Sequence, residues 1–169
     1  MSIRIFTTLL LISSIIFSCS DDDDFRYQNN FEQSKKAWLD FKEATNNSYT
    51  YTTSFDSWIG SHQETEITVS NGEVIKRSYK YTFPYDDTIE DVEWTEEGDQ
   101  IGSHEEGDEP MTLDQIYGLA ETEWLTKKDN TITYFETKNN GMISLCGYVN
   151  KDCADDCFRG ITIDSIDSL

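Results

Sequence analysis

Hydrophobic and polar positions repeat at two periods along the chain, and each period predicts a different kind of element. An apolar stripe at helical spacing predicts one helix over residues 28–46, and a second stripe predicts another helix that begins at Thr112. Thr112 and Gln115 have the spacing of a capping box, which marks the start of this second helix. Its apolar face is formed by Leu113, Ile116, Tyr117, Ala120 and Trp124.

Alternating aromatic and β-branched residues predict strands before and after the second helix. The clearest is a hairpin in which residues 66–70 and 73–76 flank Asn71-Gly72, a pair that suits a type I′ turn because both central residues need positive φ. The other predicted strands cover residues 49–52, 131–137, 142–148 and 160–166. The order α-β-β-β-α-β-β-β predicts an α+β fold, with a single antiparallel sheet of about six strands and both helices packed on one face.

The chain opens with a short apolar run that is typical of a lipoprotein signal peptide. Arg4 is the only charged residue before Cys19, and the run ends in Ile16-Phe17-Ser18-Cys19, which resembles the lipobox of lipoprotein signal peptidase. We therefore expect residues 1–18 to be cleaved and Cys19 to carry the lipid. The run is shorter than the roughly 20 apolar residues of a membrane span. The alternative is an ordinary signal peptide that ends in a chance cysteine.

Residues 19–27 are predicted to be an acidic tether to a single domain in residues 28–169. Many Gram-negative bacteria retain a lipoprotein in the inner membrane through an aspartate after the lipidated cysteine, whereas Ser20 permits sorting to the outer membrane. The four aspartates 21–24 resemble the acidic export signal of some surface lipoproteins; alternatively they keep a solvated spacer extended. We expect an outer-membrane lipoprotein of a Gram-negative envelope, surface-exposed or otherwise facing the periplasm.

The formal charge of −20 argues against binding to nucleic acid or to anionic lipid head groups by charge. Residues 86–109 contain twelve acidic residues and no lysine or arginine, which favours a mobile, solvated insertion at about 85–110 over a loop that binds a cation or a partner.

The ligand classes that this charge leaves open are cations, basic proteins and neutral glycans. We expect the domain to be a monomer. Five aromatic residues have two possible roles: Trp58, Trp94, Tyr79, Tyr81 and Tyr85. They either line a groove for a glycan or a peptide or belong to the core, and the core is the more common place for aromatic residues of strands.

Three cysteines remain after lipidation, and disulfides form readily outside the cytoplasm. A bond between Cys146 and Cys157 is expected, because it would close the base of a loop between two strands. A bond between Cys146 and Cys153 is the runner-up, and Cys153 with Cys157 would need a tight non-helical loop. The odd cysteine stays free or pairs elsewhere. Zinc is a less favoured alternative, because three cysteines lack a fourth ligand nearby.

Oxygen ligands are dense in the same loop, where Asp152, Asp155 and Asp156 are weak Ca²⁺ candidates. Their spacing is not that of an EF-hand, so local capping of the turn is favoured and no cofactor is expected. His62 and His104 each end an Ile-Gly-Ser-His string. They would form a transition-metal site only if their loops met at one end of the sheet, and a surface-loop interpretation is favoured.

The chain contains Trp38-(x)2-Phe41, then Asn47-Ser48-Tyr49-Thr50-Tyr51, then Ile67-Thr68-Val69 followed by Asn71-Gly72-Glu73-Val74. These motifs resemble a family of small secreted bacterial domains, domain-of-unknown-function family 6174. Residues 112–116 resemble its second helix and residues 141–166 its closing hairpin, so the resemblance spans roughly residues 34–167. Many members have a Cys-x-Cys motif where this chain has residues 54–57, so a site built on those cysteines is absent. The resemblance implies a small helix-and-sheet domain with no established activity.

No catalytic or cofactor motif stands out in the sequence. The first hypothesis is therefore a non-enzymatic binding or accessory module at the cell envelope. A Ca²⁺-binding or metal-responsive domain is the second hypothesis. A carboxylate-based hydrolase is ranked last, because pairs of acidic residues carry little information in so acidic a chain.

Overall fold

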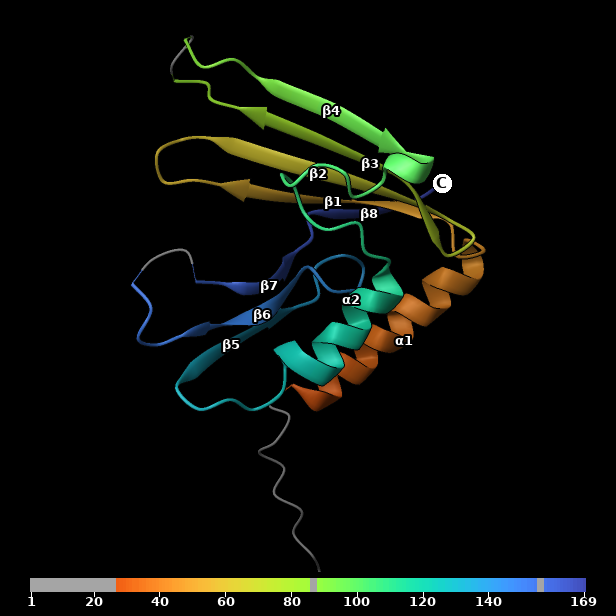
Figure 1. Cartoon of the computed structure of the whole chain (residues 1–169). Coiled ribbons are helices and arrows are strands. Elements are labelled where there is room, and N and C mark those ends of the chain that lie inside the picture. Colours follow the sequence, from red (N-terminus) through yellow and green to blue (C-terminus); the bar gives the residue numbers. More distant parts are fainter. Residues whose placement is uncertain (1–26, 86–87, 155–156) are drawn as a thin grey trace, which may run out of the picture.

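The computed structural model describes residues 27–85, 88–154 and 157–169 and has an α+β fold (Figure 1). Its helices and strands are α1 (Gln28–Ala44), β1 (Tyr49–Asp56), β2 (His62–Ser70), β3 (Glu73–Thr82), β4 (Val92–Glu97), α2 (Leu113–Leu119), β5 (Thr131–Glu136), β6 (Leu145–Asn150), β7 (Arg159–Thr162) and β8 (Ser165–Ser168). A short 3-10 turn, Gly98–Gln100, follows β4, and a π-helical turn, Ala120–Trp124, continues α2. Among the described residues, no helix is both long and apolar enough to cross a membrane.

The strands form two antiparallel sheets, so the prediction of one sheet of about six strands is wrong. The larger sheet has the order β4-β3-β2-β1-β8 and the smaller one the order β5-β6-β7. The predicted last strand, residues 160–166, is divided between them. The Ile163 amide donates to the Ser144 carbonyl at 2.8 Å, and the next amide, of Asp164, donates to the Thr52 carbonyl at 2.8 Å. The chain therefore leaves the smaller sheet after β7 and joins β1 of the larger sheet as β8.

Both predicted helices are present and lie side by side against the sheets (Figure 1). The capping box of Thr112 and Gln115 is confirmed. All five residues of the predicted apolar stripe are buried, and the π-helical turn keeps Trp124 among them. One core is formed by this stripe together with Phe31 and Trp38 of α1 and the inward residues of both sheets.

Strand β1 holds the start of α2 through two tyrosine hydroxyls. The Tyr49 hydroxyl accepts the Leu113 amide at 2.8 Å, and the Tyr51 hydroxyl donates to the Met111 carbonyl at 2.7 Å. Burial raises the pKa of both phenols, which keeps them protonated and able to hydrogen-bond. The helices therefore cover the part of the larger sheet near β1. The segment before α2 lies against this sheet and leads from it into the helix.

The predicted hairpin is confirmed, with Asn71 at φ 51° and Gly72 at φ 84° between β2 and β3. Its register also sets the two faces of the larger sheet. The inner face continues into the core and carries residues that are paired across the strands: Thr65, Arg77, Tyr79, Trp94 and Glu96. Alternate residues of the same strands share the outer face, where lysine, glutamate, serine and threonine predominate: Glu64, Glu66, Lys76, Ser78, Lys80, Glu93 and Thr95.

Candidate binding surface

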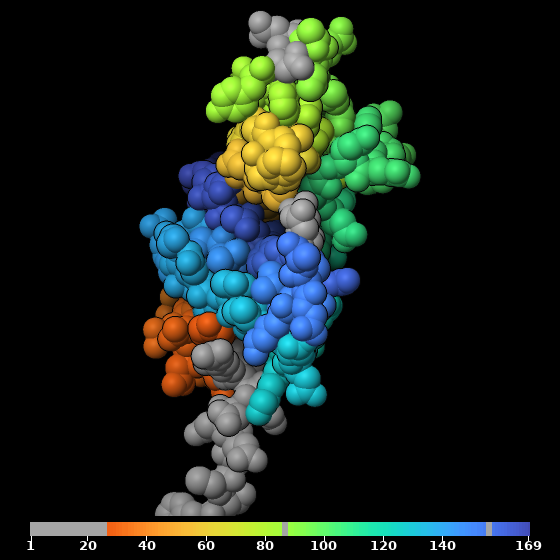
Figure 2. Space-filling view, turned by 90° about the vertical axis from the view of Figure 1, so that its left-hand side faces the viewer, coloured from red at the N-terminus to blue at the C-terminus, as the bar shows by residue number. Residues whose placement is uncertain are grey.

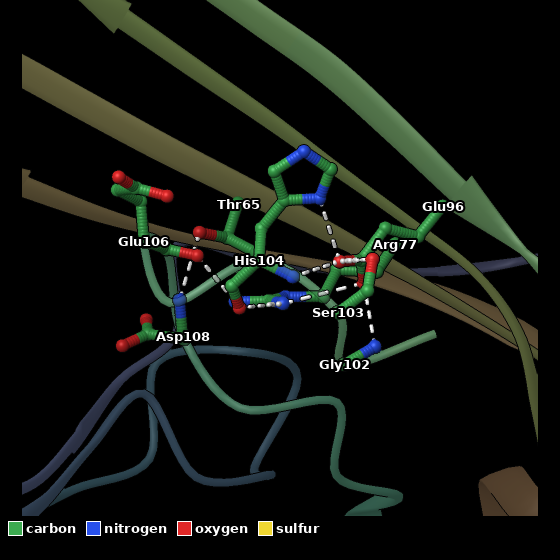
Figure 3. Close-up of polar contacts among 8 residues, drawn as sticks. All are labelled: Thr65, Arg77, Glu96, Gly102, Ser103, His104, Glu106 and Asp108. Carbon is green, nitrogen blue, oxygen red and sulfur yellow. Dashed lines mark hydrogen bonds and ion pairs between the residues drawn. The ribbon is translucent and has the colours of Figure 1, made fainter. Parts of the chain in front are cut away.

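The loop of residues 98–108 is pinned to the inner face of the larger sheet by Glu96 (Figure 3). The Glu96 side chain is 1 % exposed. Its two oxygens accept the amides of Gly102 and His104, each at 2.7 Å, the Ser103 hydroxyl at 3.1 Å and the His104 Nδ1 at 2.8 Å. Burial alone would raise the pKa of Glu96, but these hydrogen bonds outweigh it and lower the pKa well below its usual range. Glu96 is therefore an anion at neutral pH.

Arg77 on β3 completes this arrangement from the neighbouring strand (Figure 3). Its Nη1 donates to Glu96 Oε2 at 3.3 Å and to the His104 carbonyl at 3.2 Å, and its Nη2 donates to the Glu106 carbonyl. The Arg77 side chain is 2 % exposed. One buried ion pair thus hydrogen-bonds to the loop both at residues 102–104 and at Glu106. The prediction of a mobile, solvated insertion is therefore wrong for this part of the acidic segment.

Aromatic rings pack beside the ion pair. The Trp94 ring stacks on His104, with ring centres 4.2 Å apart, and on Tyr79 at 5.2 Å, while the Arg77 guanidinium lies 4.8 Å from the Trp94 ring. Of the five aromatic side chains singled out in the sequence, Tyr79 is buried and Trp94 and Tyr81 are half-buried. The Tyr79 and Trp94 rings pack against the loop at Gly107 and His104, whereas Trp58 and Tyr85 are exposed.

The loop forms one wall of a pocket of about 250 Å³ on the inner face of the sheet. The Asp108 amide donates to the Thr65 hydroxyl at 3.1 Å, which seats Gly107 and Asp108 against β2. A Cβ atom on Gly107 would lie 2.9 Å from the Tyr79 ring, so only glycine permits this close approach. Most of the residues that line the pocket are polar, and one is aromatic: Thr53, Ser54, Phe55, Gln63, Thr65, Gly107 and Asp108.

Beside the pocket, the ends of two β-hairpins expose a group of large apolar side chains that we name the hairpin tip. Its members come from the end of β1 and its turn and from the β3–β4 connection and the start of β4: Phe55, Trp58, Ile59, Tyr85, Ile89 and Val92. Trp58 is 87 % and Tyr85 80 % exposed. Figure 2 looks onto this end of the molecule, where the gold β1–β2 turn projects with the lime β3–β4 connection above it. Phe55 also lines the pocket, so the two form a continuous surface.

Hydrogen bonds within the turn keep the tip in place. Ser57 and Ser61 close the β1–β2 turn, since the Ser57 amide donates to the Ser61 carbonyl at 2.9 Å and their hydroxyls lie 2.7 Å apart. The Tyr85 ring lies directly over Gly60, where an added Cβ atom would be 2.6 Å from a ring carbon. The two hairpin ends therefore contact one another, and Trp58 and Ile59 are presented to solvent at the apex.

The surroundings of the tip and pocket carry negative charge. Between residues 49 and 109 the sequence has three basic side chains, Lys76, Arg77 and Lys80. Arg77 is buried by the loop, and both lysines lie on the outer face. Among the described acidic residues between positions 88 and 109, only Glu96 forms an ion pair, so the surface suits a positively charged ligand with apolar contacts.

The two histidines do not meet, so the transition-metal hypothesis is wrong for this pair. His62 lies on the outer face, with its Nδ1 2.8 Å from Asp56 Oδ1. His104 lies over the inner face, against Glu96 and Trp94. Within the described ranges, no group of three or more histidine, cysteine, aspartate or glutamate side chains is placed to hold a metal ion.

The disulfide differs from both expected pairings. Cys153 and Cys157 are bonded within the β6–β7 loop, with Cα atoms 6.1 Å apart, and Cys146 is a free, buried thiol. Cys146 shares the inward face of β6 with Tyr148, in register with Phe135 and Ile161, so its side chain points into the core and away from the loop. Burial raises the pKa of the Cys146 thiol to about 12, which leaves it unreactive at neutral pH.

Of the weak Ca²⁺ candidates, only Asp152 lies in the described residues. One of its carboxylate oxygens accepts the Asn130 side-chain amide. Asp155 and Asp156 lie outside the described residues, as do Cys19 and the four aspartates that follow Ser20.

Comparison with models of known protein families found no match, and comparisons with curated proteins and with solved structures found none either. The resemblance to family 6174 therefore stays a prediction from short motifs.

Proposed function

We propose that the chain is a lipid-anchored, non-enzymatic binding module of a Gram-negative outer membrane and that its hairpin tip binds a basic protein. The observation that carries this proposal is the exposure of Trp58 and Tyr85 at the apex of an acidic surface. Contiguous exposed apolar side chains with a polar rim are typical of protein-binding sites, and aromatic residues supply most of the binding free energy in such sites.

The geometry suits a partner that approaches from above the membrane. The β3–β4 connection lies at the opposite end of the molecule from the start of α1, as both Figure 1 and Figure 2 show. Tyr27 follows the predicted lipid site, Cys19, by eight positions, and eight residues of extended chain span at most about 29 Å. An anchored domain would therefore stay close to the bilayer with its hairpin tip directed outward.

Charge favours a basic protein over the other ligand classes. The pocket beside the tip is large enough for one long side chain, and Asp108 is one of the residues that line it. A lysine or arginine of the partner can pair with Asp108 there, while its apolar neighbours contact Trp58 and Tyr85. A nucleic acid would be repelled by the net charge of the chain, and a neutral glycan would gain nothing from it.

The binding role is tested by site-specific photo-crosslinking in cells of the native host. A photo-reactive amino acid replaces Trp58 in one variant and Leu39, which is 51 % exposed on α1, in a matched control. We expect a discrete adduct with a basic protein from position 58 and none from position 39. Equal adducts from both positions, or none from position 58, would contradict the proposed binding surface.

The anchor and its orientation need a separate experiment. Metabolic labelling with a fatty acid should label the chain and fail in the Cys19→Ala variant. Protease treatment of intact cells should remove a C-terminal epitope tag if the domain is surface-exposed. Protection of the tag until lysis would place the domain in the periplasm, and the search for the partner would then turn to envelope proteins.

A further inference from the structure

The smaller sheet, which lies below the larger sheet in Figure 1, has an exposed apolar face. Its outward positions are in register across the three strands, where Ile132 pairs with Val149, and Tyr134 pairs with Gly147, which pairs with Gly160. Ile132, Tyr134 and the nearby Phe158 are 42 %, 38 % and 38 % exposed. The Tyr134 and Phe158 rings form an edge-to-face pair with centres 6.4 Å apart.

Glycine in the middle of this face brings the aromatic rings down onto the sheet. A Cβ atom on Gly147 would lie 2.6 Å from the Phe158 ring, so the ring rests directly on the strand. The result is an apolar surface, which we name the platform and define as Ile132, Tyr134, Val149 and Phe158. It contrasts with the hairpin tip, whose side chains project from turns.

The platform is also nearly free of net charge in a chain of charge −20. One outward position of the three described strands is acidic, Glu136, and its Oε2 is paired with the Lys138 Nζ at 2.5 Å. A surface of this composition can approach a bilayer at little electrostatic cost, whereas the acidic hairpin tip cannot.

The start of the domain is attached to this sheet. The Tyr27 hydroxyl donates to the Thr133 carbonyl at 3.2 Å, and its ring lies 5.8 Å from the Phe135 ring. Thr133 stands between Ile132 and Tyr134 on β5. Tyr27 packs on the core side of β5, and the opposite side of the same strand carries Ile132 and Tyr134. The chain therefore enters the domain beside the strand that bears the platform, and the predicted lipid site, Cys19, lies eight positions earlier.

From these observations we propose that the platform is a membrane-contact face that lies on the bilayer of the anchoring membrane and orients the hairpin tip away from it. This inference rests on the lipid anchor proposed above. Tyrosine and phenylalanine side chains are favoured in the interfacial region of a bilayer, and a chain that is already anchored gains this contact without a further loss of translational freedom.

The test uses the full lipidated chain in vesicles of phosphatidylethanolamine and phosphatidylglycerol. A single cysteine is introduced by Tyr134→Cys and labelled with an environment-sensitive fluorophore, and Leu39→Cys and Trp58→Cys are the matched controls. The native cysteines do not compete, because Cys146 is buried and Cys153 is bonded to Cys157. We expect a blue shift at position 134, with loss of fluorescence when a lipid spin-labelled near its head group is included. Positions 39 and 58 should show neither change.

A second variant tests whether the apolar side chains cause the contact. Thr162 is exposed on the same face, and a fluorophore on Thr162→Cys should be quenched in the otherwise unchanged chain. Combining Ile132→Ser, Tyr134→Ser and Phe158→Ser should remove that quenching while lipidation persists.

Other results would overturn the inference in distinguishable ways. If the chain is lipidated but position 134 is not quenched, the platform does not contact the membrane and the anchor stands. A blue shift at position 134 that depends on protein concentration and not on spin-labelled lipid would assign the platform to a contact between two copies. A chain that carries no lipid would overturn the anchor and the membrane contact together, and crosslinking from position 58 would still decide the role of the tip.

Discussion

Glu96 and Arg77 form a buried ion pair across neighbouring strands, with Oε2 and Nη1 3.3 Å apart and neither side chain more than 2 % exposed. Both charges make further hydrogen bonds to the 98–108 loop, although the buried Arg77 Nε has no partner among the described residues. An inward-pointing charge on an edge strand also hinders edge-to-edge aggregation, and β4 is an edge of the larger sheet. The pair therefore links the edge strand β4 to β3 and fixes the position of the loop that forms the pocket wall.

Replacing Glu96 by glutamine should destabilise the protein strongly. The variant leaves the Arg77 charge buried without its counter-ion, a change that typically costs about 3–5 kcal/mol of unfolding free energy. Urea denaturation followed by tryptophan fluorescence measures the loss. Glu97→Gln is the matched control, because the same substitution one residue later falls on an exposed outer-face side chain and should change stability by about 0.5 kcal/mol or less. A similar effect of both substitutions would contradict a structural role for the pair.

Acid should weaken the protein through the same carboxylate. Because the pKa of Glu96 is lower in the folded state than in the unfolded chain, its contribution is complete above the ordinary glutamate pKa of about 4.3 and is lost as the pH falls further. The difference in unfolding free energy between the unaltered chain and Glu96→Gln should therefore be constant from about pH 6 to 8 and shrink below about pH 4. A difference that stays constant down to pH 3 would show that Glu96 ionisation does not stabilise the fold.

The sequence was most informative where a pattern is local. The stripe from Leu113 to Trp124, the capping box at Thr112 and the Asn71-Gly72 turn depend on neighbours within a few residues, and the structure confirms all three. The division of the predicted last strand could not be foreseen in this way. It depends on two amides, those of Ile163 and Asp164, that hydrogen-bond to residues of different sheets.

The candidate surface was harder to predict than the fold. A block of acidic residues usually indicates a solvated segment, and nothing local distinguishes Glu96 from the glutamates beside it. One signal was available, because Arg77 alternates with Tyr79 and Tyr81 directly after the second arm of the predicted hairpin and so shares their inward face. A buried arginine needs a buried carboxylate, and the acidic segment was the nearest source.

Thiol labelling distinguishes the observed disulfide from the expected one. If Cys19 carries the proposed lipid, no cysteine should react in the folded chain, because Cys146 is buried with a raised pKa and Cys153 is bonded to Cys157. Unfolding without a reductant should expose one thiol, and mass spectrometry of peptides should locate the label on Cys146. If Cys146 were instead bonded to Cys157, the exposed Cys153 would react in the native state.

Removing the hydroxyl of Tyr117 should cost stability without disturbing the surface. This hydroxyl lies 2.8 Å from the Ser34 hydroxyl and also contacts the Ser34 carbonyl and the Ile143 amide, so it joins α1, α2 and the segment before β6. Tyr117→Phe leaves these buried groups short of a partner, at a cost of about 1–3 kcal/mol in thermal or urea unfolding. Tyr134→Phe, in which the ring is exposed, is the matched control and should have little effect.

Asp108 should decide the preference of the pocket for a positively charged group. In Asp108→Asn the pocket keeps its shape but loses the carboxylate, and a charge-assisted hydrogen bond of about 1.5–3 kcal/mol corresponds to a loss of affinity on the order of tenfold to a hundredfold. The crosslinking yield from position 58 should fall accordingly. Asp167→Asn makes the same charge change on β8, where the side chain is exposed on the outer face, and should leave the yield unchanged.

If both variants reduce the yield equally, the partner is attracted by the total charge of the chain, because long-range steering does not depend on which acidic residue is neutralised. If neither does, the aromatic tip binds without help from the pocket, and a neutral ligand such as a glycan becomes the better candidate.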